Sequence, residues 1–141
     1  MALAAAQVVD ALAARVSPLA PAGGVHTSRA WPLATLPAWR VFAGDEAVTE
    51  AMMSGINEHA LDVEVQGTAH AAADLDDALH AMASAALAAL FTAPVPYQLQ
   101  LAAIQRRLAT EGEASVGRIT LRVRATFYVD PAAPETIVPT L

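Results

Sequence analysis

One segment near the end of the chain alternates apolar and polar residues without a break. Residues 116–129 read VGRITLRVRATFYV, and from Ile119 onward every second residue is apolar. The apolar set is Ile119, Leu121, Val123, Ala125, Phe127 and Val129, and the set between them is Arg118, Thr120, Arg122, Arg124, Thr126 and Tyr128. Because successive strand side chains point to opposite faces, this segment predicts a long β-strand with one apolar and one basic face.

A second alternating segment is acidic where the first is basic. Residues 58–67 read EHALDVEVQG, with Leu61, Val63 and Val65 facing inward and Asp62, Glu64 and Gln66 facing outward. If the two strands are neighbours, Asp62 and Glu64 lie across from Arg122 and Arg124 as cross-strand ion pairs. Exposed pairs contribute about 0–1 kcal/mol each, so they would set register more than stability.

Helical periodicity marks two main segments and a shorter one. Residues 3–16 form the first predicted helix, which ends at Ser17-Pro18 because proline cannot continue the hydrogen-bond ladder. Residues 71–91 form the predicted helix with the clearest pattern, and acidic residues lie at its N-terminus. Its apolar face consists of Leu75, Leu79, Met82, Ala86 and Leu90. Residues 97–107 are interpreted as a shorter helix or turn, with Leu101, Ile104 and Leu108 as its apolar positions.

The remaining segments predict short strands and connections. Residues 25–29 and 38–42 are interpreted as strands, and Gly44-Asp45-Glu46 is expected to end the second. A loop or an irregular edge strand is expected at 47–55, and a polar loop at 110–115.

The element order indicates an α+β fold. We expect a mixed or antiparallel sheet of about four strands covered on one face by the two main helices. We expect the chain to consist of one domain at residues 1–130 and an extended C-terminal tail at residues 131–141. The tail has three prolines and little periodicity.

Composition narrows the function classes. The chain has 141 residues, 55% of them hydrophobic, which suits one domain with its own core. It has no cysteine, so disulfides and thiol chemistry are excluded.

The net charge of −6 argues against a protein that coats nucleic acid, and no apolar run reaches the length of about 20 residues that spans a bilayer. The N-terminal segment contains Asp10 and lacks a basic start, so it is interpreted as mature structure rather than a signal peptide.

Candidate catalytic groups are sparse. His70, Asp74 and Asp77 share a helical i, i+4, i+7 spacing, and Asp76 and His80 are a second i, i+4 pair; a divalent metal can use such groups. A solvated helix start explains them better, and we predict no metal, cofactor or catalytic site. Glu58-His59 lacks a recognisable third partner for acid–base work, and Ser54-Gly55 is not a nucleophile elbow.

Two groups are candidates for an interface. Trp31 and Trp39 can mark a protein contact, although a core position is an equal alternative for one of them. Arg118, Arg122 and Arg124 have three possible partners: acids of the same chain, acids of an adjoining subunit, or nucleic acid, which the acidic total makes the weakest.

The order of features resembles the tail terminator family of long-tailed bacteriophages, also described as tail-completion or minor tail protein U-like. The matching phrases are SRAWPLATLPAWRVF, EHALDVEVQG, DLDDALHAMASAALAAL and TEGEASVGRITLRVRATFYV, and together they cover most of residues 3–130. The resemblance consists of element order and short phrases rather than a catalytic signature.

The resemblance implies a non-enzymatic virion protein at the tail–neck junction, made in the host bacterial cytoplasm. Such proteins form a ring, typically of six subunits, on the last ring of the tail tube. They stop tube polymerisation and provide the interface to the head-side connector, and genomic DNA passes through the lumen without specific binding. On this reading, Arg118, Arg122, Arg124, Asp62, Glu64, Trp31 and Trp39 are the expected interface residues, and no membrane is involved. The alternatives are another neck or head–tail joining protein, or a small metal-dependent hydrolase built around His59, His70 and His80.

Overall fold

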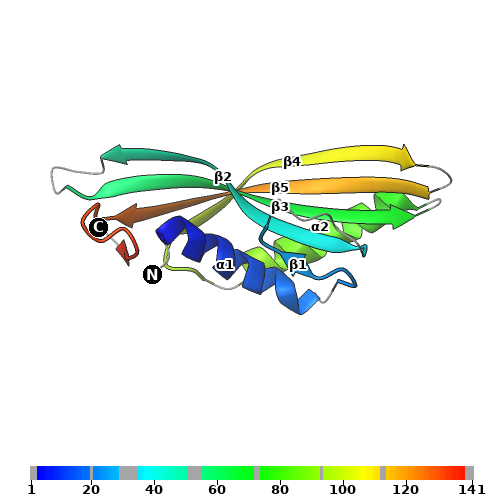
Figure 1. Ribbon diagram of the computed structural model, residues 1–141, viewed down its shortest axis with the longest axis horizontal. Coiled ribbons are helices and arrows are strands. Elements are labelled where there is room, and N and C mark those ends of the chain that lie inside the picture. Colours follow the sequence, from blue (N-terminus) through cyan, green and yellow to red (C-terminus); the bar gives the residue numbers. More distant parts are fainter. Residues whose placement is uncertain are drawn as a thin grey trace.

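A twisted sheet with two helices against one face is the frame of the molecule (Figure 1). The structure is a computed structural model, and it describes residues 3–19, 21–28, 35–50, 55–71, 74–92, 94–111 and 114–138. Within these residues the strands are β1 (Val25–His26), β2 (Ala38–Glu50), β3 (Asn57–Ala71), β4 (Gln98–Glu111), β5 (Ala114–Val129) and β6 (Ile137–Val138). The helices are α1 (Ala4–Val16), which a short 3₁₀ turn (Ser17–Leu19) follows, and α2 (Leu75–Phe91).

The long alternating strand predicted from sequence is β5, and it lies inside the sheet. The strand order is β1-β2-β3-β5-β4, and β6 also pairs with β5. β1 runs parallel to β2 and the other pairings are antiparallel, so the sheet is mixed. The α+β class is therefore confirmed, but the sheet has six strands in the described chain rather than about four.

Both helices pack on the same face of the sheet, as expected. α1 contacts β2, while α2 contacts β3 and β5, and Figure 1 shows them together below the sheet. The inward side chains of the central strands are fully buried against them, among them Val63, Val65, Leu121 and Val123. The two helices are joined where Nη1 of Arg15 donates to the carbonyl of Leu90 at 3.0 Å, near the C-terminus of α2.

The helix or turn predicted at residues 97–107 is wrong, because β4 occupies that segment. Its pairing with β5 shifts between Leu101 and Ala103, which marks a β-bulge. The extra residue places Leu101 and Ile104, three apart, on the same side of the strand. Together with Leu108 they imitate the three- and four-residue spacing of a helix. The polar loop expected at 110–115 is shorter too, because β4 and β5 still pair at Glu111 and Ala114.

Several element ends also differ from the predictions. β2 does not stop at Gly44: its register with β3 shifts between Ala43 and Glu46, and the strand continues to Glu50. This is the irregular edge strand that was one of two alternatives, and residues 51–54 lie outside the described chain. Similarly, β3 continues to Ala71, so α2 begins at Leu75 rather than at 71. The first short strand is limited to Val25–His26.

Part of the C-terminal tail returns to the domain. Ile137 and Val138 pair with the end of β5, opposite Val129 and Tyr128. The backbone N–H of Ala4 donates to the carbonyl of Pro134 at 3.1 Å, which ties the tail to the start of α1. The division of the chain into a domain and a tail at residue 130 stays a prediction. These contacts would have to break if the tail separated from the domain.

Candidate functional site: the uncovered face of the sheet

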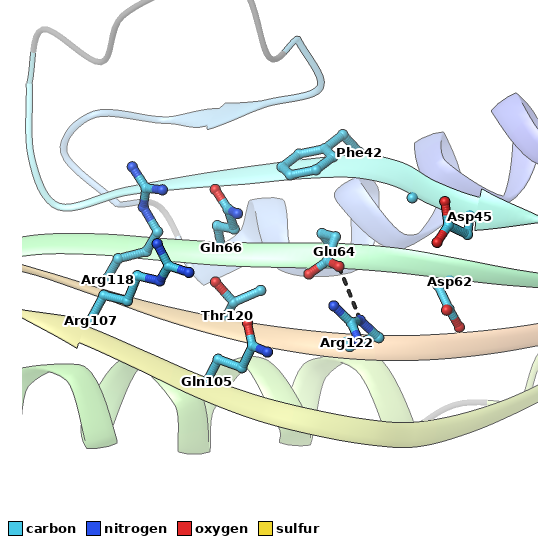
Figure 2. Close-up of a pocket in the computed structure, with 11 residues that line it drawn as sticks. Phe42, Asp45, Asp62, Glu64, Gln66, Gln105, Arg107, Arg118, Thr120 and Arg122 are labelled. Atoms are coloured by element: carbon cyan, nitrogen blue, oxygen red, sulfur yellow. Dashed lines mark hydrogen bonds and ion pairs between the residues drawn. The ribbon is translucent and has the colours of Figure 1, made fainter.

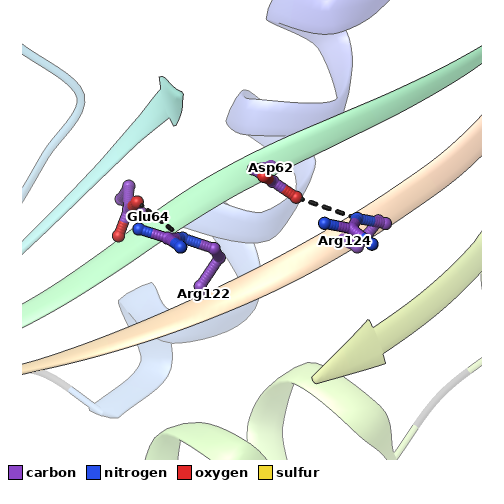
Figure 3. Close-up of polar contacts among 4 residues, drawn as sticks. All are labelled: Asp62, Glu64, Arg122 and Arg124. Atoms are coloured by element: carbon purple, nitrogen blue, oxygen red, sulfur yellow. Dashed lines mark hydrogen bonds and ion pairs between the residues drawn. The ribbon is translucent and has the colours of Figure 1, made fainter. Parts of the chain in front are cut away.

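The face of the sheet opposite the helices carries the charged residues of β3 and β5. In the observed register, Asp62 lies across from Arg124 and Glu64 across from Arg122. Nε of Arg122 donates to Oε1 of Glu64 at 3.1 Å, and Nε of Arg124 donates to Oδ1 of Asp62 at 3.0 Å. Figure 3 shows both contacts spanning the two strands. The predicted cross-strand pairing is confirmed, and its partners belong to the same chain.

These pairs lie at the surface. The side chains of Glu64 and Asp62 are 15% and 19% exposed, and those of Arg122 and Arg124 are 38% and 47% exposed. The guanidinium groups therefore form the outer layer over partly covered carboxylates. Because solvent still reaches the arginines, each pair contributes only about 0–1 kcal/mol to folding, while the arginines keep donors that can meet another protein.

Arg118 has different neighbours from the other two arginines. It lies across from Thr68 on β3 and across from Arg107 on β4. The ion pairs formed within the described residues include neither Arg118 nor Arg107. Two like charges side by side repel each other, so this end of the face attracts a negatively charged group. Sequence reasoning missed Arg107 because its segment was assigned to a helix.

A shallow hollow of about 400 Å³ lies on this face (Figure 2). Arg107 and Arg118 line one end of it, and Asp45 and Asp62 line the other. Glu64, Arg122 and Thr120 lie between them. Apart from Phe42 and Gly44, its lining is charged or polar, and it comes from β2, β3, β4 and β5, so the hollow can receive polar side chains of another protein.

The two tryptophans have no demonstrated part in this face. Trp39 is 2% exposed and belongs to the core, which was the alternative to an interface role. Its ring passes over Gly67 of β3, where an added Cβ would lie 2.9 Å from Cη2 and Cζ3. Trp31 lies outside the described residues.

The histidine candidates do not gather into one site. His70 is in β3, so the helical spacing that linked it to Asp74 and Asp77 does not exist. Asp76 and His80 are on α2, where both side chains are exposed. Among the described residues, no group of three or more His, Asp or Glu side chains could hold a metal ion.

His59 has a partner that sequence reasoning did not find. Its Nδ1 lies 2.6 Å from Oε2 of Glu46, and its ring stacks on Phe127 with 5.3 Å between the ring centroids. Glu58, its predicted partner, points to the opposite face because neighbouring strand residues alternate. The sequence pattern could not identify Glu46 as a partner of His59, because it predicted that the strand ends at residues 44–46. Ser54 lies outside the described residues.

The hydroxyl of Tyr97 is buried beside the core, and its pKa is shifted. Burial raises the pKa of its hydroxyl above the usual 10.0, and nearby Arg15 acts in the opposite direction. The hydroxyl oxygen is buried and finds no hydrogen-bond partner among the described residues. The ring packs edge-on against Phe127, so Tyr97 acts chiefly as an apolar side chain.

No helix of the described chain is both long and apolar enough to cross a bilayer.

Among known proteins, the chain has matches in solved structures. No protein family matches the chain, and no curated protein matches it. Among the structures that match, one is described as "Virion of native gene transfer agent (GTA) particle". That chain is 24% identical, the match covers 87% of this chain and 90% of that one, and the TM-score is 0.47.

Proposed function

We propose that this chain is a structural virion protein of the tail terminator type. It forms a homohexameric ring on the end of a phage tail tube, stops tube polymerisation and presents a surface to the head-side connector. Its place is the tail–neck junction of the virion. The sequence phrases of residues 3–130 that resemble this family support the type, and the uncovered face supports the mode of action.

The observation that carries the proposal is the polar sheet face with its ordered charges. Two arginines are held by carboxylates of the neighbouring strand at 3.0 and 3.1 Å, so their positions are defined before any partner arrives. Charges arranged in this way give an interface its register and its choice of partner more than its affinity. A tube protein or connector is a partner that must dock in one register.

The same face suits a channel through which DNA passes. Tight, salt-dependent DNA binding requires several cationic side chains that neutralise phosphates. Here Glu64 and Asp62 already neutralise Arg122 and Arg124. If the face borders the ring lumen, DNA meets paired charges and slides past without specific binding.

Ring formation is the first test. The purified chain, alone and mixed with assembled tail tubes, is examined by mass photometry and negative-stain microscopy. We expect a ring of one defined mass or a cap at one end of each tube. Monomers at every concentration together with bare tubes would overturn the proposal. A monomer that binds a divalent metal would instead support the hydrolase alternative.

Charge exchange tests whether the face itself is the contact. Arg122→Glu with Arg124→Glu should weaken ring formation or tube capping, because four acidic side chains then adjoin. The control also carries Glu64→Arg and Asp62→Arg, which restores both pairs with their charges exchanged. If the control regains stability but not assembly, the face is an interface; if it regains both, the pairs act only within the chain.

A further inference from the structure

The hollow on the uncovered face has opposite charges at its two ends. Arg107 of β4 and Arg118 of β5 lie across from each other at one end, and Asp45 of β2 lies at the other (Figure 2). All three side chains are exposed. The ion pairs formed within the described residues include none of them. Both ends therefore carry charge that the described chain does not neutralise.

A β-bulge turns Arg107 toward the hollow. Leu101 lies across from the buried Val123 and so faces the helix side, and unbroken alternation from Leu101 would turn Arg107 the same way. The register shift between Leu101 and Ala103 inserts one residue into the strand. Arg107 consequently lies across from Arg118, on the polar face.

A second bulge acts on Asp45. Because Ala43 lies across from the buried Val63, unbroken alternation would turn Asp45 to the helix side. The register of β2 with β3 shifts between Ala43 and Glu46, and Asp45 lines the hollow. Bulges re-aim side chains and are frequent beside functional sites. Here one bulge on β2 and one on β4 bring opposite charges to the same face.

Neutral and paired side chains occupy the middle of the hollow. Gln66, Thr120 and Gln105 lie side by side on β3, β5 and β4. Next to them, Glu64 neutralises Arg122. The middle therefore offers hydrogen-bonding groups without net charge, and the choice of partner is made at the two ends.

The distance between the ends follows from the geometry of β5. At the acidic end Asp62 lies across from Arg124, which is six positions along the strand from Arg118. A strand rises about 3.3 Å per residue, so the two ends are about 20 Å apart. An extended segment of about seven residues spans that length.

This charge pattern favours a protein segment over nucleic acid. A polyanion bound at Arg107 and Arg118 would bring further phosphates close to Asp45, Asp62 and Glu64, which line the same hollow. Repulsion there would offset the attraction at the arginines. A protein segment can carry both signs, and a guanidinium group is well matched to a carboxylate.

We propose that the hollow docks an extended segment of a partner protein with an acidic residue at one end and a basic residue about 20 Å away. Arg107 and Arg118 receive the carboxylate and Asp45 receives the cation, so the charges select one direction of the segment along the sheet. This inference rests on the proposed function, because it names the chemistry of the segment that the tube protein or the connector brings to this face.

Two synthetic peptides test the hollow directly. The first has glutamates at one end and lysines at the other, separated by about 20 Å of extended threonine and serine residues. The second has the same length and glutamates at both ends. Binding to the whole chain is measured by NMR titration at low salt. We expect the first peptide to bind about fivefold or more tightly, because only its charges are opposite to those at both ends.

Substitutions locate the contact. Arg107→Gln should weaken binding of the first peptide about threefold, because one ion pair of ordinary surface strength is lost, and adding Arg118→Gln should weaken it further. Arg106→Gln is the matched control: it removes the same charge from the same strand, but Arg106 lies across from the buried Ile119 and faces the helix side. Asp45→Asn should narrow the preference for the first peptide over the second.

Two results of these titrations would overturn the inference. One is the absence of any preference between the peptides, or an equal loss of binding in the Arg106→Gln control. The other comes from a short DNA duplex used as a competing probe. If the duplex binds more tightly than the first peptide and is weakened by Arg107→Gln, the hollow is a nucleic-acid contact.

The same variants are weighed by mass photometry and mixed with tail tubes, so the two proposals can fail separately. Rings that no longer cap tubes after Arg107→Gln with Arg118→Gln support both proposals. Rings of this variant that cap tubes normally overturn the docked segment and leave the tail terminator. A chain that binds the first peptide but never forms rings or caps supports the docked segment and counts against the tail terminator. A chain that does neither overturns both.

Discussion

At the scale of single residues, the arginines of β5 divide into two kinds. Arg122 and Arg124 lie against Glu64 and Asp62 of β3, whereas Arg118 lies beside Arg107 of β4. Alternation alone assigned all three to one face and offered the two acids as partners. It left partners within the chain and partners in another subunit as alternatives. The register of β3 with β5 gives Arg122 and Arg124 a partner within the chain, and a contact with another subunit stays a prediction.

Tyr97 provides a residue-scale prediction. Its buried hydroxyl has no hydrogen-bond partner among the described residues, whereas its ring packs against Phe127. Tyr97→Phe keeps the ring and removes the desolvated oxygen, so the free energy of unfolding should stay the same or rise by up to about 1 kcal/mol. Urea unfolding measures it. A loss of more than about 1 kcal/mol would show that the hydroxyl has a partner.

The same variant has a predicted pH dependence. Burial raises the pKa of Tyr97 in the folded chain above 10.0, so the folded state holds the phenolic proton more tightly than the unfolded state. The titration of this group leaves the free energy of unfolding unchanged below pH 10.0 and lowers it as the pH rises above that value. The unfolding free energy of the wild type should therefore fall more steeply at alkaline pH than that of Tyr97→Phe. Parallel curves would contradict the prediction.

At the scale of elements, β4 shows why a strand can resemble a helix. Hydrophobic periodicity is read along one segment, and the bulge between Leu101 and Ala103 inserts one residue into that period. Before the bulge Leu99 and Leu101 face the helices, and after it Ile104 and Leu108 do. Only the pairing with β5 reveals that the phase has changed, so residues 97–107 could not be assigned from their own pattern.

The contact between β2 and β3 at Trp39 gives an element-scale prediction. A Cβ at position 67 would lie 2.9 Å from the ring of Trp39 and 3.0 Å from Cε of Met82. Gly67→Ala should therefore destabilise the fold by about 1–3 kcal/mol through overpacking. Thermal and urea unfolding measure the loss. Trp39→Phe removes the crowded part of the ring, so the double variant should lose less than the sum of the two single losses; additive losses would count against the contact.

At the scale of the whole molecule, the two surfaces of the sheet differ in what covers them among the described residues. One face is closed by α1 and α2 and holds the core, so it is not available to partners. The face opposite the helices remains, and in the proposed ring it meets the tube, the connector or the lumen.

The C-terminal tail gives a prediction at this scale. A chain that ends at Asp130 loses β6 and the bond from the N–H of Ala4 to the carbonyl of Pro134. It also loses the packing of Ile137 on the core. We expect a loss of about 1–3 kcal/mol in unfolding free energy, because a few hydrogen bonds of ordinary strength disappear. The midpoints of urea unfolding measure this loss, provided that both chains show the same dependence of unfolding free energy on urea concentration. An unchanged midpoint would favour the extended tail predicted from the sequence.

The sequence by itself determined the elements whose signals are local and uninterrupted. β5, the central part of β3, α1 and most of α2 follow from alternation, helical spacing and proline breaks, and the opposite charges of two strands indicated their pairing. The tertiary structure alone decided the phase of β4 after its bulge, the continuation of β2 beyond Gly44, the return of β6 and the neighbours of Arg118. The physical reason is range: a side chain's face is set by its own strand until a bulge intervenes, and from there on only the partner strand defines it.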